Sequence, residues 1–368
     1  MSGEDEVRVH AEPLRNFCEL VFHKMDVPEE DARITTDVLV TADLRGVDSH
    51  GVARLRRYVN GLREGIMVAH PQVQVAAETP ATALIDAGAG LGQPVAYRAM
   101  EKAIQKAMDV GSGFVTVRNS NHYGIAGYYA MMALERDCIG ISMTNAAPLV
   151  VPTFGQNAIL GTNPIAVAAP AGQEWPFVLD MATSTVPRGK LEVVSRMGKP
   201  IPAGWATDET GTPTTDTGQV LENLKQRAGG GLLPLGGAGE TLSGHKGYGL
   251  ALLVDILCAI LPGAAYADLV YPQTADGKPL PSKIGHFLGA WRVDAFRPVE
   301  EFKTAMDDLQ RRLKNASKAE GQNRIYIHGE KEYEEAERRS RDGIPLNPKV
   351  AADLRAIAAE VGVEYDIE

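Results

Sequence analysis

Apolar residues recur at helical spacing near both ends of the chain. Leu14, Phe17 and Val21 lie three and four positions apart, which is the spacing of one helix face. A second helix is predicted to begin near Pro28, because a proline suits the first turn and acidic residues follow it. A third is predicted over residues 49–65, and residues 297–368 are again mostly helical and highly charged.

The middle of the chain has shorter apolar runs that are typical of strands. Between them lie stretches with helical periodicity, one of which ends at Gly111, a common helix terminator. Residues 195–244 are rich in Gly, Pro and Thr and predict a long surface loop. The expected strands are 73–88, 114–119, 138–147, 165–172, 176–184 and 284–296, and the expected helices are 94–111, 124–137 and 245–263.

This alternation predicts an α/β protein with a mixed sheet. We expect residues 1–72 and 300–368 to form a helical domain built from both chain ends. Residues 73–299 would then form an α/β domain inserted between them. The chain shows no internal repeat and no low-complexity linker.

Composition excludes several classes of partner. The net charge of −10 and the pI of about 5.4 argue against nucleic acid, which requires a basic face. The longest apolar run is interrupted by Asp255 and ended by Pro262, so no membrane-spanning segment is predicted. The acidic start "MSGEDEVRVH" does not resemble a secretory signal. The 3 scattered cysteines predict no disulfide framework and a reducing compartment, by default the cytoplasm.

Several familiar motifs fail on inspection. Glycines at 88, 90 and 92 follow a predicted strand and open a predicted helix, but Gln93 stands where a dinucleotide fingerprint needs its third glycine. The acidic residue expected at the end of the next strand is also missing. The chain has no phosphate-binding G-K-[ST] loop, no G-x-S-x-G elbow and no cluster with metal-ligand spacing, so no metal is predicted.

Two segments do carry chemistry. In "VRNSNHYGIAGYY", His122 lies at a strand-to-helix junction beside Gly124, where it either approaches a ligand or only caps a turn. In "DLRGVDSHGVARLRRYV", a continuous helix would place His50, Arg54 and Tyr58 on one face, although a solvated basic face explains that pattern equally well. An imidazole that transfers a proton and an arginine that binds a carboxylate suit oxidation of a 2-hydroxy acid. The hydride acceptor must then be a cofactor.

These segments resemble, in order, the type-2 malate/L-lactate dehydrogenase family, whose relatives act on ureidoglycolate, sulfolactate, diketogulonate and cyclic imines. The resemblance implies a small 2-keto or 2-hydroxy acid substrate, NAD or NADP, a homodimer with its active site near the subunit interface, and a non-Rossmann NAD(P)-binding domain. It extends over about residues 12–335. The matching motifs are "DLRGVDSHGVARLRRYV", "NSNHYGIAGYYA", "ISMTNAAPLVVPTFG", "LGTNPIAVAAPAG", "LDMATSTVPRGK", "GHKGYGLALLVD" and "IGHFLGAWRVDAF".

The resemblance also implies roles for individual residues. His122 matches the proton donor of some members and His50 that of others, so the two assignments stay open. Substrate contacts are expected from Ser49, Arg54, Tyr58 and His286. Cofactor contacts are expected from Leu179, Asp180, Met181, Ala182, Thr183, His245, Lys246, Gly329, Glu330 and Ala146.

Some positions depart from the family pattern. His328 replaces a proline that is usual before Gly329, and Ala146 and Ala147 replace polar residues, which weakens a ureidoglycolate assignment. The segment "GHFLGAWRVDAF" favours the malate branch, so malate/oxaloacetate or a lactate-like pair is the expected substrate. A cyclic imino-acid reductase and a dinucleotide-binding protein without activity are the alternatives. Arg57 is a candidate second cation for a dicarboxylate, and neither the substrate nor the choice of NAD or NADP follows from the sequence.

Overall fold

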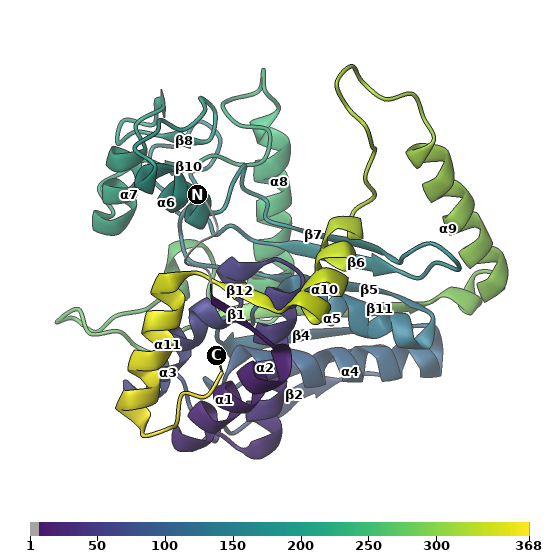
Figure 1. Cartoon of the computed structure of the whole chain (residues 1–368), viewed down its shortest axis with the longest axis horizontal. Helices are drawn as coiled ribbons and strands as arrows, with labels where there is room; N and C mark the ends of the chain where they lie inside the picture. Colours follow the sequence, from purple (N-terminus) through teal and green to yellow (C-terminus); the bar gives the residue numbers. More distant parts are fainter. Residues whose placement is uncertain (1–6, 368) are drawn as a thin grey trace.

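A seven-stranded mixed sheet forms the centre of the computed structural model, which describes residues 7–367 (Figure 1). Its strand order is β2-β3-β4-β11-β5-β6-β7, and β3–β4 is the parallel pair among otherwise antiparallel neighbours. The strands are β2 (Gln74–Glu78), β3 (Thr82–Asp86), β4 (Ser112–Ser120), β5 (Cys138–Thr144), β6 (Ile165–Ala169), β7 (Phe177–Met181) and β11 (Ile284–Arg292). The predicted mixed sheet is confirmed. That this sheet belongs to a non-Rossmann NAD(P)-binding domain stays a prediction.

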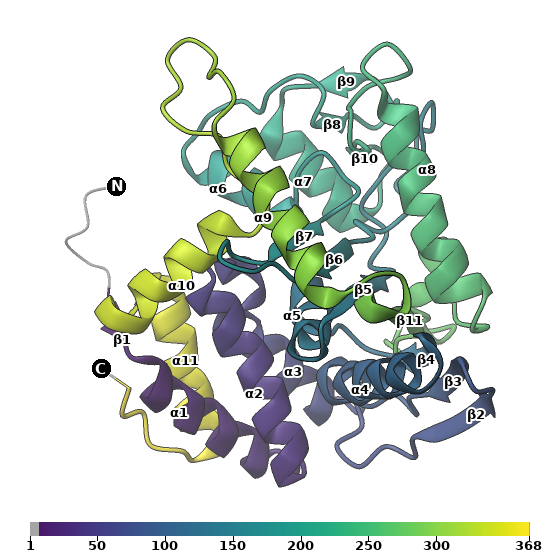
Figure 2. The same ribbon diagram turned by 90° about the vertical axis from the view of Figure 1, so that its right-hand side faces the viewer.

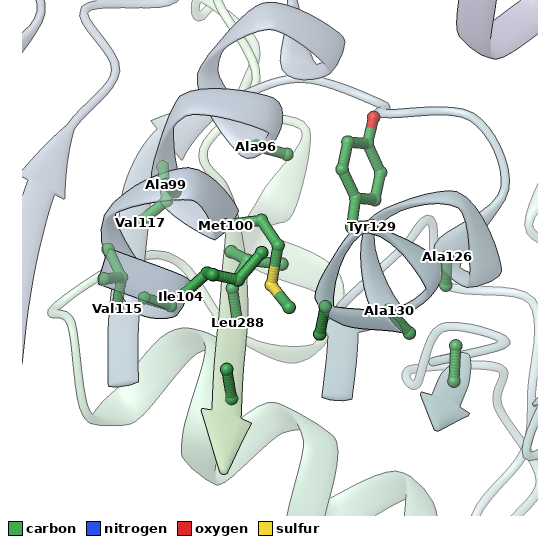
Figure 3. Close-up of a cluster of buried hydrophobic side chains, with 14 of the residues drawn as sticks. Ala96, Ala99, Met100, Ile104, Val115, Val117, Ala126, Tyr129, Ala130 and Leu288 are labelled. Atoms are coloured by element: carbon green, nitrogen blue, oxygen red, sulfur yellow. The ribbon is translucent and has the colours of Figure 1, made fainter. Parts of the chain in front are cut away.

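One face of the sheet is covered by α4 (Gly92–Val110) and α5 (Ala126–Met132), as Figure 3 shows. Small side chains such as Ala99 and Ala130 let these helices approach the strands, and Met100 and Leu288 fill the space between them. Helix α4 ends where Gly111 adopts a positive φ of 94°, as the sequence predicted. The opposite face carries α8 (Gly244–Asp255) and the π-helical turn η4 (Ile256–Ile260).

Both chain ends share a second hydrophobic core. Strand β1 (Val7–Val9) pairs with β12 (Ile344–Leu346), and the N- and C-terminal helices lie side by side in both views (Figures 1 and 2). The helices are α1 (Ala11–Lys24), α2 (Glu29–Leu44), α3 (Leu55–Arg63), α10 (Glu330–Asp342) and α11 (Pro348–Val361). This grouping agrees with the expected association of the two ends, and the domain boundaries stay a prediction. The prediction that the N-terminal segment is not a secretory signal concerns mainly residues 1–6, which lie outside the described range.

Helix α9 (Val299–Lys314) does not join this terminal group, although it falls within the predicted helical domain. It lies against the turn between β6 and β7 (Figure 2). Asp307 accepts hydrogen bonds from the backbone N–H groups of Gly172 and Gln173, at 2.9 and 2.8 Å. These polar contacts position the helix. They could not be predicted from the spacing of apolar residues along the chain.

The predicted surface loop at 195–244 is wrong for much of its length. This segment contributes Val220 and Leu232 to a small core that also contains Leu191, which precedes the segment. Its strands are only two residues long, too short to leave a periodic signal. The elements are α6 (Arg188–Arg196), β8 (Ala206–Thr207), β9 (Pro213–Thr214), α7 (Thr217–Gln226) and β10 (Gly231–Leu232).

Among the described residues, no helix is long and apolar enough to cross a membrane. Cys18, Cys138 and Cys258 are buried and form no disulfide. The remaining short helical turns are η1 (Asp48–His50), η2 (Val52–Arg54), η3 (Ala133–Arg136), η5 (Ala267–Val270) and η6 (Val293–Ala295).

Candidate active site

The segment that carries His50 is not the continuous helix expected from the sequence. Two 3₁₀ turns, η1 and η2, precede α3, which begins only at Leu55. The break lies at Gly51, whose backbone adopts φ −84° and ψ −149°. His50 and Tyr58 are therefore not brought together by helical spacing; the fold brings both against the same third residue, His122.

A buried carboxyl explains why the chain breaks at Gly51. A Cβ atom at this position would lie 1.9 Å from Oδ1 of Asp43, so only glycine allows this approach. Oδ2 of Asp43 accepts a hydrogen bond from the N–H of Val52 at 2.8 Å. Burial raises the pKa of Asp43 to about 8. This contact fixes the turn that carries His50.

His122 follows the last residue of β4 and precedes α5, at the junction that the sequence indicated. Its Nδ1 lies 2.8 Å from the hydroxyl of Tyr58, and the N–H of Gly124 donates to the same nitrogen at 3.3 Å. The ring stacks on His50, with centroids 5.5 Å apart. Within the described residues Nε2 has no hydrogen-bond partner, so this nitrogen is available to a ligand.

The electrostatic environment keeps both imidazoles neutral. Burial, followed by the charges of Arg54 and Arg57, lowers the pKa of His50 to about 4. Burial, Arg57 and His50 together lower the pKa of His122 well below its usual value. The Nε of Arg54 donates to the backbone oxygen of Ser49 at 2.6 Å, and the Oγ of Ser49 lies 2.9 Å from Nδ1 of His50. An anion that binds beside the two arginines would raise both histidine pKa values.

A cavity of about 470 Å³ opens beside this cluster. Its size is within the range of small-molecule sites. Ser49 and His50 form part of its wall, together with the backbone around Gly124 and Gly127. Other lining residues come from β7 and from the segment before α10, which include Val178, Asp180, Ala182, Ile327, His328 and Gly329.

Alternation along β7 divides the predicted cofactor stretch into two sets. Asp180 and Ala182 line the cavity, whereas Leu179, Met181 and Thr183 do not, as expected when successive side chains point to opposite faces. Oδ2 of Asp180 accepts a hydrogen bond from the N–H of Gly127 at 2.7 Å. Burial raises the pKa of Asp180 to about 6.

The segment before α10 contributes backbone and ring surface to the cavity. Gly329 has a positive φ of 97° and begins α10, and His328 packs edge-on against Phe177. Glu330, predicted as a cofactor contact, does not line the cavity and is bonded elsewhere. It is 2% exposed and pairs with Lys314 and Arg324, at 2.7 and 3.3 Å. The structure gives Glu330 a role in fixing the segment that precedes α10.

His122, Arg54 and Tyr58 do not themselves line this cavity, and neither do four further predicted residues. His286 lies inside the sheet with both ring nitrogens 2.8 Å from hydroxyls, those of Thr144 and Ser120. The N–H of Ala146 donates to Oδ1 of Asn163, which is a contact within the fold. His245 and Lys246 are exposed in the first turn of α8.

Arg45 was missed by reasoning from the sequence. Its side chain is 8% exposed, lines the cavity and stacks over Tyr333 at 4.7 Å. No carboxylate of the described residues lies within ion-pair distance of Arg45. The available signal was its place in "DLRGVDSHG", five residues before His50. A buried guanidinium without a carboxylate partner is suited to bind an anion.

Two stacked imidazoles beside two arginines, one of the imidazoles in the wall of a cavity, are suited to proton transfer on a small anion. Comparison with known proteins agrees. The family model described as malate/L-lactate dehydrogenase matches residues 9–355. The chain is 52% identical to malate dehydrogenase of Pyrococcus horikoshii, with 98% of this chain and 97% of that protein covered. It is 42% identical to L-sulfolactate dehydrogenase of Methanocaldococcus jannaschii, with 94% and 95% covered.

Solved structures show the same likeness. The malate dehydrogenase structure from Pyrococcus horikoshii OT3 superposes with a TM-score of 0.89 at 49% identity, with 98% of this chain and 97% of that chain covered. The malate dehydrogenase structure from Entamoeba histolytica gives 0.92 at 36% identity, with 99% and 100% covered. The chain belongs to the malate/L-lactate dehydrogenase family. It is a 2-hydroxy acid dehydrogenase.

Proposed function

We propose that the protein interconverts a small 2-hydroxy acid and the matching 2-keto acid with NAD or NADP, and that His122 carries the proton. The observation that supports this most is the free Nε2 of His122, whose ring stacks on His50, a residue of the cavity wall. Malate/oxaloacetate and a lactate-like pair are the substrates to test first.

The cavity has groups that fit a dinucleotide. The Asp180 carboxylate faces the cavity and suits a ribose hydroxyl, and the Arg45 guanidinium suits a phosphate. A Cβ at Gly127 would lie 2.9 Å from Oδ2 of Asp180, so glycine keeps this carboxylate in place. His328 and Gly329 would close the cavity on one side. When bound, the nicotinamide supplies or accepts the hydride.

The side chains supply the proton and the orientation. In the reductive direction His122 in its imidazolium form donates its Nε2 proton to the developing alkoxide, while its Nδ1 proton is donated to the Tyr58 hydroxyl. Arg54 holds the substrate carboxylate. His50 polarises the keto oxygen that becomes the alkoxide. Gln93 is fully buried near Tyr58, and neither of its amide atoms has a hydrogen-bond partner among the described residues, so its Oε1 is a candidate acceptor for the Tyr58 proton once the side chain reorients. In the oxidative direction neutral His122 carries its proton on Nδ1, donated to Tyr58, so that Nε2 accepts the hydroxyl proton; in this tautomer Nδ1 no longer accepts from the N–H of Gly124.

Absorbance at the reduced-nicotinamide band tests this proposal. NADH and NADPH are supplied separately with oxaloacetate, pyruvate, sulfopyruvate, diketogulonate and a cyclic imino acid. Oxidation with a keto acid supports the proposal and identifies the cofactor. Turnover with the imine alone would make the protein a cyclic imino-acid reductase. No turnover together with intact cofactor binding would favour a dinucleotide-binding protein without activity.

The homodimer is also a proposal. The exposed face of α8 and η4 carries large apolar side chains that are 37–55% exposed. Leu253, Ile256 and Ile260 recur on it at helical spacing, and such a contiguous patch marks an interaction site. We expect sedimentation to give a dimer and Ile256→Asp with Ile260→Lys to give a monomer; a monomeric wild type would contradict this. A cytoplasmic location is proposed from the buried free cysteines and is tested by cell fractionation.

A further inference from the structure

Arg54 is proposed to bind the carboxylate of the substrate. A substrate with a second acidic group would therefore need a second cation in the site. Arg54 is the last residue of η2, and Arg57 lies three residues later in the first turn of α3. The next residue, Tyr58, contacts His122. Arg57 is therefore placed beside the histidine pair.

Arg57 is held in position without being neutralised. Its Nη2 donates to the hydroxyl of Tyr271 at 2.8 Å, and its guanidinium lies 6.0 Å from the Tyr271 ring centre. No carboxylate of the described residues lies within ion-pair distance of Arg57. An arginine has five N–H donors, so most of them are open to a ligand.

The adjacent Arg56 shows what an ordinary arginine of this helix does. It forms ion pairs with Asp353 and Glu360, both at 2.7 Å, on the outer surface of α11. Arg54 and Arg57 form no such pair within the described residues. Residues 54–57 thus contain one arginine that is paired within the fold and two that form no ion pair with the described residues.

Both free arginines act on the histidine pair. After burial, the charge of Arg57 makes the largest contribution to the lowered pKa of His122, and Arg54 also contributes. One anionic group would balance one of these charges and leave the other. Two anionic groups on one substrate would balance both and raise the pKa of His122 further than one group would.

We propose that Arg57 binds the second acidic group, a carboxylate or sulfonate, of a dianionic 2-keto or 2-hydroxy acid, and so selects such acids over monoanionic ones. This inference rests on the proposed function, whose substrate class it names. Arg54 binds the carboxylate next to the reacting carbon. Tyr271 is a positioning residue that keeps the guanidinium aimed at the site.

The test compares oxaloacetate and sulfopyruvate with pyruvate in wild type and variants. The wild type should prefer the dianionic acids. In Arg57→Met we expect kcat/KM for them to fall about ten- to hundredfold, the effect of losing a charged hydrogen bond, with pyruvate within about threefold. Arg56→Met, the matched control, should leave the ratio unchanged. Tyr271→Phe should shift the ratio in the same direction by a smaller factor.

Three results would overturn the proposal: a wild type that prefers pyruvate, an Arg57→Met that loses all substrates equally, or one that loses none. If Arg57→Met does not fold, Arg57→Lys and Tyr271→Phe carry the same comparison. The rise in Tm on adding L-malate, compared with L-lactate, measures recognition without turnover. A wild type inactive with every acid would overturn the proposed function; a larger Tm rise with L-malate, abolished in Arg57→Met, would still support the role of Arg57.

Discussion

His122 and His286 are two histidines of one sheet region with contrasting surroundings. Each has a ring nitrogen 2.8 Å from a hydroxyl, and burial lowers the pKa of each. His286 is fully buried, has both nitrogens paired and stacks on Tyr123 at 4.6 Å. His122 has one nitrogen paired and the other free, and two arginines act on its charge.

A lowered pKa therefore does not by itself identify a catalytic histidine. The pKa of His286 falls to about 3 because of burial alone, whereas charged neighbours contribute to the shift of His122. A ligand can remove the second kind of shift by bringing a negative charge, but it cannot undo burial. A free nitrogen and a pKa shift that a ligand can partly reverse are what we expect of a reactive imidazole, and of these two histidines His122 has both.

The largest effect is expected from removing the reactive imidazole. His122→Ala should slow the hydride step about 10²–10⁴-fold, the usual contribution of a positioned acid. His50→Ala should mainly raise KM, because His50 is proposed to bind the substrate oxygen without transferring its proton. Single-turnover kinetics separates these effects. A reversed pattern would make His50 the acid, and no change in either variant would refute the mechanism.

The next effect concerns the hydroxyl beside His122. In Tyr58→Phe the Nδ1 proton of the imidazolium loses its acceptor. Because hydrogen bonds to charged groups contribute about 1.5–3 kcal/mol, we expect kcat to fall at least about tenfold. The pKa seen in the pH profile of kcat should also fall, since the charged form loses more than the neutral form. An unchanged profile would show that Tyr58 only fills space.

Removing the structural imidazole should affect folding more than rate. His286→Leu leaves the hydroxyls of Ser120 and Thr144 without the ring as partner. An unsatisfied buried polar group costs about 1–3 kcal/mol, so the free energy of unfolding should fall by about that much in urea titrations. The kcat of the folded variant should change less than about tenfold. A loss as large as that of His122→Ala would place His286 among the reactive groups.

The sequence predicted the parts of the site better than their geometry. It singled out His50, Tyr58 and His122, and the structure shows His50 and Tyr58 both in contact with His122. The continuous helix expected to carry His50 and Tyr58 is interrupted at Gly51. The cause is a tertiary contact with Asp43, eight residues earlier, which local periodicity cannot reveal. Arg45 was missed because nothing in its neighbourhood along the chain shows that it is buried without a carboxylate partner.

The same limit applies to the fold. The strand over 284–296 was expected, but its place between β4 and β5 depends on pairing with segments more than 140 residues away. The alternation along β7 was available from the sequence and would have divided the stretch from Leu179 to Thr183 into two sets. The sequence did not show which of the two sets faces a cavity, because the cavity is formed by segments that are distant along the chain.

The smallest effect is a pH dependence that distinguishes burial from catalysis. In the folded protein His286 has a pKa of about 3, whereas an unfolded histidine has about 6.5. Between these values the unfolded chain binds a proton that the folded chain does not, so His286 stabilises the fold less as the pH falls. His286→Leu lacks this dependence.

The stability difference between wild type and His286→Leu should therefore be largest above pH 7 and shrink by up to about 2 kcal/mol between pH 6.5 and pH 5. Asp43 and Asp180, whose pKa values are raised to about 8 and about 6, make stability fall as the pH rises. They are present in both proteins, so their effect cancels in the difference. Urea titrations at pH 7.5, 6 and 5 measure it. A difference independent of pH would mean that His286 is not held neutral by burial, and the contrast with His122 would then fail.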